Sequence, residues 1–140
     1  MTNKKKEFDV FLCHNSADKS EVIAVANELK RRGLKPWLDI WELRPGFPWQ
    51  DELQKQIKSI KSSAVFVGSN GMGPWQDFEQ KAFLTQFMRR KCPVIPVLLE
   101  SCEERPELPP FIAEMAWVDL RKEGAIDRLI WGITGENPNA

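Results

Sequence analysis

The sequence predicts an α/β fold in which a parallel, five-stranded sheet carries helices on both faces. Short apolar runs alternate with amphipathic segments along the chain, which is the order expected of strands joined by helical crossovers. The apolar runs are continuous rather than alternating with polar residues, so the strands are expected to be buried on both faces. A chain of 140 residues, 42% of them hydrophobic, suits one domain with a substantial core.

The first two expected strands are separated by one helix. The first strand covers residues 8–13, where Val10, Phe11 and Leu12 stand in succession. A helix follows to about residue 32, and Asp18 and Glu21 have the spacing of a capping box at its start. A short second strand is expected over residues 35–39.

The remaining elements follow from the same alternation. Pro48 and Pro74 suit the first position of a helix, because proline has no amide hydrogen and none is needed there. The expected elements are a loop over residues 40–47, a helix from 48 to about 61, a strand over 64–67, a helix from 75 to about 90, a strand over 93–99, a loop over 100–110, a strand over 116–118 and a helix over 125–133.

The loops that follow the strands are expected to form the ligand edge of the sheet. Right-handed crossovers would bring the loops 13–18, 39–48 and 68–75 to one edge. Ligands of doubly wound sheets bind at that edge, near the point where the strand order reverses. Chemistry-bearing residues in these loops are therefore the first candidates for a site.

Composition excludes several classes of function. The 20 basic and 20 acidic residues balance, so no net positive charge favours binding to nucleic acid or to an anionic membrane. No apolar run approaches the ~20 residues that span a bilayer, and the first residues do not have the pattern expected of a signal peptide. Three cysteines without CxxC spacing and a single histidine disfavour a disulfide framework, a metal site and a Ser-His-Asp triad. Cys13 is expected to be buried rather than nucleophilic, and we expect a cytoplasmic protein.

Trp75 and Glu79 are the most informative pair of residues. Their spacing predicts that they lie one turn apart on one face of the third helix, with Ala82 and Phe83 bordering the carboxylate. The tryptophan is not distinctive by itself, because Pro-Trp-Gln-Asp stands at residues 48–51 as well as at 74–77. Glu79 is therefore either a carboxylate at a binding site or an ordinary glutamate of a helix.

Four separate stretches together resemble a TIR domain (Toll/interleukin-1 receptor type) of the bacterial kind. Phe8-Asp9-Val10-Phe11-Leu12-Cys13-His14 resembles the family's first box, and Leu38-Asp39 with Leu43-Arg44-Pro45-Gly46 resembles its second box and BB loop. Trp75-x-x-x-Glu79 is similar to the motif of the NAD-cleaving members. Phe111 and Trp117 lie in the region of the third box, but the family's adjacent Phe-Trp pair is absent.

This resemblance implies a flavodoxin-like fold and a particular domain organisation. Residues 7–134 would form the TIR domain, residues 1–6 an N-terminal tail, and residues 135–140 a C-terminal tail or the start of a linker. In a longer protein, a sensor or effector domain would be attached.

The resemblance also implies an NAD⁺ nucleosidase for which NAD⁺ is the substrate and no cofactor is needed. Glu79 would be catalytic, because a carboxylate can stabilise the positive charge that develops on the ribose when nicotinamide leaves. Water would then give ADP-ribose, and the adenine ring a cyclic product; the sequence leaves both open.

Five residues are candidates for substrate binding: His14, Asn15, Asp39, Trp49 and Trp75. Asp39 and Trp49 match positions in the family, and Trp75 would stand beside the ligand, one turn from Glu79. The loop that contains His14 and Asn15 could offer amides to phosphates near a helix start. Each also has a structural interpretation. His14 and Asn15 could simply shape a loop, Asp39 could hydrogen-bond turn amides, and both tryptophans could pack in the core.

Arg44-Pro45-Gly46 forms either a flexible surface loop or, as in the family, a loop that closes over the site and mediates self-association. The alternative function is accordingly a non-catalytic scaffold that acts in signalling or immunity through contacts with other TIR domains. A phosphorylated response regulator is disfavoured, because the third strand ends in Val67-Gly68-Ser69 and offers no aspartate there.

Overall fold

The computed structural model describes residues 7–103 and 106–138, and it confirms the predicted parallel, five-stranded sheet. The strand order is β2-β1-β3-β4-β5, and all pairings are parallel. The chain reverses its direction of travel across the sheet after β2, which puts a switch point beside β1. The strands are β1 Val10–Cys13, β2 Pro36–Trp37, β3 Ser63–Val67, β4 Val94–Leu98 and β5 Val118–Asp119.

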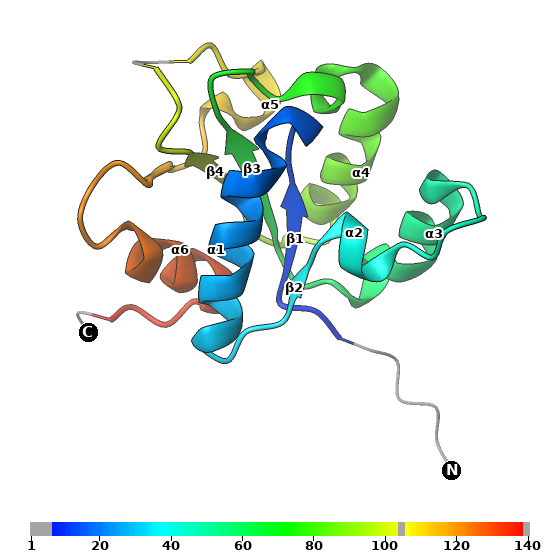
Figure 1. The fold of residues 1–140 in the computed structure, drawn as a ribbon, viewed down its shortest axis with the longest axis horizontal. Helices are drawn as coiled ribbons and strands as arrows, with labels where there is room; N and C mark the ends of the chain where they lie inside the picture. The colour runs from blue at the N-terminus through cyan, green and yellow to red at the C-terminus, as the bar shows by residue number, and fades with distance from the viewer. Residues whose placement is uncertain (1–6, 104–105, 139–140) are drawn as a thin grey trace.

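Helices cover both faces of this sheet. In Figure 1, α1 and α6 lie side by side on one face, and α4 lies on the other. The α-helices are α1 Lys19–Arg31, α2 Asp39–Glu42, α3 Trp49–Gln56, α4 Phe78–Arg89, α5 Pro110–Ala113 and α6 Ala125–Thr134; the 3₁₀ turns are η1 Ser16–Asp18, η2 Ile57–Ser59 and η3 Gly73–Gln76.

The side chains of β1 divide between two cores, because successive residues of a strand point to opposite faces. Val10 and Leu12 belong to the core beneath α1 and α6. Phe11 and Cys13 belong to the core beneath α3 and α4. Burial on both faces accounts for the continuous apolar runs of the sequence.

Two differences from the expected elements affect the site. The second strand does not extend to Asp39, which instead begins α2 within the segment expected to be a loop. The Asp39 carboxylate accepts a hydrogen bond from the amide of Ile40 at 2.9 Å. Asp39 therefore lies at the ligand edge, but at a helix start rather than at a strand end.

The expectation that Trp75 and Glu79 share one helix is wrong. Trp75 lies in η3, and α4 begins at Phe78. Between them Asp77 is extended, with φ −71° and ψ 148°. Gly71 and Gly73 have positive φ values of 69° and 64°, which tightens the chain into a separate turn before the helix begins.

Three smaller expectations also change. Asp18 forms no capping hydrogen bond; it is buried, and its carboxylate accepts a hydrogen bond from the Asn70 side chain at 3.1 Å. The helix α5 begins in the expected loop, and β5 begins at Val118. The proposed tail 1–6 and the final residues 139–140 lie outside the described residues.

Candidate functional site

A cavity of about 400 Å³ opens at the ligand edge, beside the end of β1. Four of the residues expected to bind substrate line it: His14, Asp39, Trp49 and Trp75. They come from the end of β1, the start of α2, the start of α3 and η3 respectively. The fold thus brings together residues that are far apart in the sequence, next to the switch in strand order, where doubly wound sheets bind ligands.

His14 and Asp39 form the polar part of the lining, which we call the polar end of the cavity. His14 supplies a hydrogen-bond acceptor there. Its Nδ1 lies 2.9 Å from the carbonyl oxygen of Leu12. A carbonyl oxygen only accepts, so Nδ1 carries the proton and Nε2 has a free lone pair. Burial lowers the pKa of His14 below its ordinary value, and the imidazole is neutral at pH 7.

Lys19 is a site residue that the sequence interpretation missed. Its ammonium group lies 2.5 and 2.6 Å from the two carboxylate oxygens of Asp39. The Asp39 carboxylate also comes within 3.9 Å of His14 Nε2. Only its position in the sequence could have indicated this role, because Lys19 begins the helix that follows β1 and therefore lies at the ligand edge. The ion pair neutralises the charge of Asp39.

Trp49 and Trp75 form the aromatic part of the lining, which we call the aromatic end of the cavity. The ring of Trp75 has its centroid 5.4 Å from that of Phe11 and 6.4 Å from that of Trp49. Phe83 of α4 packs near both indoles; its ring centroid lies 6.1 Å from that of Trp49 and 6.4 Å from that of Trp75. Trp75 therefore packs against the core and lines the cavity at once, so its two interpretations are compatible.

Glu79 does not line the cavity. It lies in the first turn of α4 with its side chain exposed, and the next residue, Gln80, lines the cavity instead. The reason lies further along the helix, where Leu84 and Phe87 are fully buried and fix the inward face. Gln80 is one turn before Leu84 on that face, whereas Glu79 is about 100° away from it.

Asn15 is placed between two loops rather than in the cavity wall. Its side-chain oxygen accepts from the amide of Ala17 at 3.0 Å, and its side-chain nitrogen donates to the carbonyl oxygen of Asn70 at 3.0 Å. A Cβ atom added to Gly73 would lie 2.9 Å from the Asn15 side chain. Asn15 thus ties the loop after β1 to the loop after β3.

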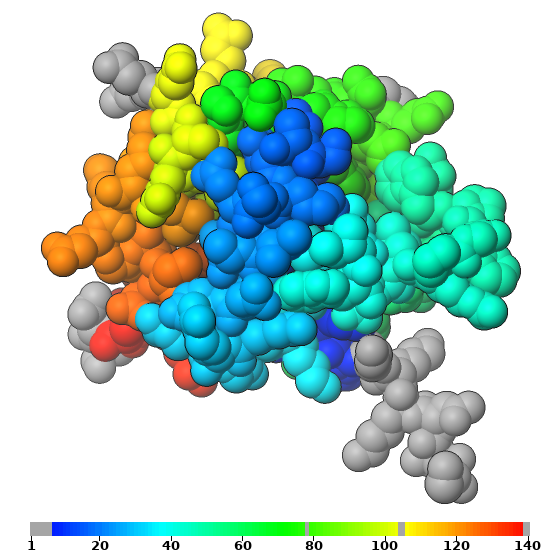
Figure 2. All heavy atoms as spheres, viewed as in Figure 1, coloured from blue at the N-terminus to red at the C-terminus, as the bar shows by residue number. Residues whose placement is uncertain are grey.

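The residues Arg44, Pro45 and Gly46 are all exposed, between α2 and α3. Gly46 has a φ of 99°, and the guanidinium of Arg44 lies 4.9 Å from the ring centroid of Phe47, which is 49% exposed. In Figure 2 the neighbouring segment that carries α3 protrudes from the body of the molecule. These residues are available for contact with another molecule.

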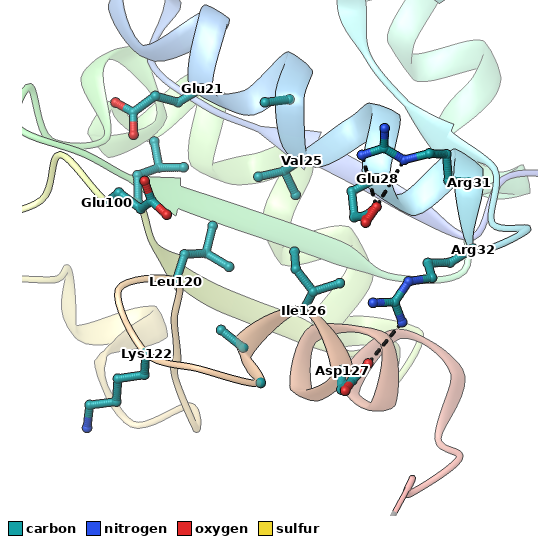
Figure 3. A pocket seen from close by; sticks show the side chains of 14 residues that line it. Glu21, Val25, Glu28, Arg31, Arg32, Glu100, Leu120, Lys122, Ile126 and Asp127 are labelled. Atoms are coloured by element: carbon teal, nitrogen blue, oxygen red, sulfur yellow. Dashed lines mark hydrogen bonds and ion pairs between the residues drawn. The ribbon is translucent and has the colours of Figure 1, made fainter.

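A larger cavity, of about 560 Å³, lies between α1 and α6 (Figure 3). Four of its charged side chains form ion pairs: Arg32 with Asp127 at 2.9 Å and Arg31 with Glu28 at 3.0 Å. None of the residues expected to bind substrate lines it. We therefore take the smaller cavity beside β1 as the candidate site.

The described residues contain no group of three or more His, Cys, Asp or Glu side chains arranged to hold a metal ion. In residues 7–103 and 106–138, no helix has the length and apolar character required to cross a membrane.

The buried imidazole predicts a pH dependence of stability. In the unfolded chain the pKa of His14 is about 6.5, whereas in the fold it is lower, chiefly because of burial. Between these two pKa values the unfolded state binds more protons, so stability falls as the pH decreases through that window. We expect the urea midpoint to fall more between pH 7.5 and 5.5 for the native protein than for His14→Gln. Equal losses would contradict this origin, and no second histidine complicates the comparison.

Comparison with known proteins gives matches over nearly the whole chain. The family model described as TIR domain matches residues 10–130. A curated relative, the "Probable 2′ cyclic ADP-D-ribose synthase TcpO" of Methanobrevibacter olleyae, is 27% identical over 139 residues, covering 94% of this chain and 40% of the relative. The chain thus spans about two fifths of that relative's length.

Solved structures show the same fold. The TIR domain of the Toll-related receptor TRR-2 from Hydra magnipapillata has a TM-score of 0.65 at 20% identity, covering 89% of this chain and 92% of that one. A TIR-STING receptor from C. gigas has a TM-score of 0.71 at 17% identity, covering 96% of this chain and 41% of that one. The TIR domains of the activated Roq1 resistosome have a TM-score of 0.63 at 17% identity, covering 89% and 98%.

Proposed function

Because this chain belongs to the TIR domain family, we propose that it is an NAD⁺ nucleosidase, which releases nicotinamide and forms ADP-ribose or a cyclic ADP-ribose. The observation that carries the proposal is the cavity beside β1, which joins an aromatic end to a polar end at the ligand edge of the sheet. The name of the TcpO relative supports the same chemistry. Incubation with NAD⁺, followed by chromatographic detection of nicotinamide, tests it.

The two ends of the cavity suit the two groups joined by the bond that breaks. The flat nicotinamide ring fits beside the indoles of Trp49 and Trp75, and the ribose hydroxyls fit at the polar end. There His14 Nε2 can accept a hydrogen bond from a hydroxyl. Lys19 and Asp39 together present a donor and acceptors without a net charge.

We assign the catalytic role to Glu79. When the bond between ribose and nicotinamide breaks, its electron pair neutralises the ring nitrogen, and the ribose becomes an oxocarbenium-like cation that a carboxylate stabilises. Asp39 is held by Lys19, whereas Glu79 forms no ion pair with the described residues. Its side chain is exposed and stands one residue before the cavity-lining Gln80, and we propose that it turns toward the cavity mouth when substrate is bound.

We further propose that self-association completes the site, since in a single copy Glu79 faces solvent. The exposed Arg44-Pro45-Gly46 loop, with Ile40 and Phe47 53% and 49% exposed, would supply the contact. The partners would then be NAD⁺ and other TIR domains, with a sensor or effector domain in a longer protein, in signalling or immunity. The three free cysteines suit the cytoplasm.

Activity is accordingly expected to rise more steeply than linearly with protein concentration. Gly46→Val is expected to flatten that rise, because a φ of 99° strains any residue with a Cβ atom and a β-branched one most. No atom lies within 4 Å of the added Cβ, so the fold itself should survive. Nicotinamide release measured over a hundredfold range of concentration, alongside light scattering, checks this; strict proportionality in the native protein would contradict it.

The second candidate function is a scaffold that acts only through TIR contacts. The exposure of Ile40 and Phe47 beside the loop favours it, because large apolar side chains on a surface often mark an interface. Under this alternative, Gly46→Val would abolish signalling and Glu79→Gln would leave it intact. The two functions are compatible, and the pair of variants separates them.

A further inference from the structure

Gln80 carries a polar atom of the cavity that the fold leaves unsatisfied. The side chain lines the cavity, and its Oε1 atom is buried without a hydrogen-bond partner among the residues that the structure describes. A buried acceptor in this state destabilises a protein, so native structures contain few of them. Its retention in a cavity wall suggests that a ligand supplies the missing donor.

The position of Gln80 indicates which part of a ligand it meets. Phe83 is three residues further along α4 and therefore a neighbour on the helix surface. Phe83 contacts Trp49 and Trp75, so Gln80 belongs to the aromatic end of the cavity. The polar groups of His14 and Asp39 come from β1 and α2 instead. The missing donor is thus expected on a flat aromatic group rather than on a sugar.

We propose that Gln80 recognises the carboxamide of the nicotinamide ring, with Oε1 accepting a hydrogen bond from the carboxamide N–H. This inference rests on the proposed function and names a specificity-determining residue for it. Nicotinamide combines an aromatic ring, which suits the indoles, with a primary amide that offers two N–H donors at the ring edge. Nicotinic acid, ionised at neutral pH, offers none. Gln80 therefore selects the amide form of the dinucleotide over the acid form.

The test compares NAD⁺ with nicotinic acid adenine dinucleotide in the native protein and in Gln80→Leu. The native protein should prefer NAD⁺, and Gln80→Leu should lower kcat/KM for NAD⁺ about tenfold, as expected for one lost hydrogen bond. The kcat/KM of the variant for nicotinic acid adenine dinucleotide should change little. The ratio of the two kcat/KM values, which measures the preference for NAD⁺, should therefore fall by a similar factor. Gln76→Leu is the matched control, because Gln76 is exposed in η3 and does not line the cavity.

A stability measurement separates recognition from mere packing. Because Gln80→Leu removes an unsatisfied buried acceptor, we expect its Tm to rise by about 3 °C. A gain in stability combined with a loss of selectivity is the signature of a polar group kept for a ligand. Gln80→Met, which keeps the side-chain length, should behave in the same way if leucine distorts the wall.

Direct binding keeps this proposal distinct from the proposed function. Calorimetric titration with nicotinamide and with nicotinic acid needs no catalysis, so it tests Gln80 even if the native protein does not cleave NAD⁺. Tighter binding of nicotinamide by the native protein, lost in Gln80→Leu, supports the proposal. An unchanged preference in the variant, or no binding of nicotinamide and NAD⁺ by the native protein, overturns it.

Discussion

Glu79→Gln is expected to lower the rate of nicotinamide release about 10²–10³-fold at saturating NAD⁺. Loss of a charge that stabilises a transition state removes about 3–4 kcal/mol of that stabilisation, and each ~1.4 kcal/mol corresponds to a factor of ten in rate. The neutral amide keeps the size of the side chain but cannot offset the charge of an oxocarbenium-like ribose. The measurement is kcat, taken at a protein concentration high enough for self-association.

Two controls make the Glu79 result interpretable. Glu79 is exposed, so its substitution should change stability by no more than about 0.5 kcal/mol. Glu114→Gln removes the same charge from another exposed position and should leave the rate unchanged. Asp39→Asn tests the rival carboxylate, which lines the cavity but is paired with Lys19. A large loss in Asp39→Asn with none in Glu79→Gln would move the catalytic role to Asp39.

The position of Glu79 shows where sequence interpretation reached its limit. Pro74 signals a helix start, but it opens only the turn η3, and α4 begins after Asp77, which forms no side-chain cap hydrogen bond. The glycines at 71 and 73 adopt positive φ, so the turn closes before the helix begins. Choosing between two adjacent starts depends on how Leu84 and Phe87 pack, which a local pattern does not contain.

The sheet and the location of the cavity were predictable for a physical reason. Burial on both faces makes the strands continuous apolar runs, and parallel crossovers must then gather the loops at one edge. His14, Asp39 and Trp75 lie in those loops, whereas Trp49 was expected from its position in the family. Lys19 was not predicted, because its pairing with Asp39 depends on how α1 and α2 approach each other across 20 residues of sequence.

The largest expected loss of stability follows Phe11→Ala. Phe11 is 1% exposed, and its ring lies 5.1 Å from Trp37, 5.4 Å from Trp75 and 5.9 Å from Phe87 between centroids. Truncating a buried phenylalanine costs about 3–5 kcal/mol, because the transfer free energy is lost and a cavity remains. The free energy of unfolding of a domain is typically ~5–15 kcal/mol, so the substitution would remove a large share of it. Urea unfolding measures this loss.

The matched control for Phe11→Ala is Phe47→Ala, because Phe47 is 49% exposed beside the loop at 44–46. Its free energy of unfolding should change by no more than about 0.5 kcal/mol. Equal effects of the two substitutions would contradict the assignment of Phe11 to the core.

Phe11 also links the core to the site, because it lines the cavity itself and supports Trp75, another lining residue. Under conditions in which Phe11→Ala is still folded, the indole loses its support, and NAD⁺ should bind more weakly than to the native protein. The ring of Phe11 therefore stabilises the fold and also positions Trp75 at the aromatic end of the cavity. Native affinity in folded Phe11→Ala would show instead that Trp75 is held by Trp49 and Phe83 alone.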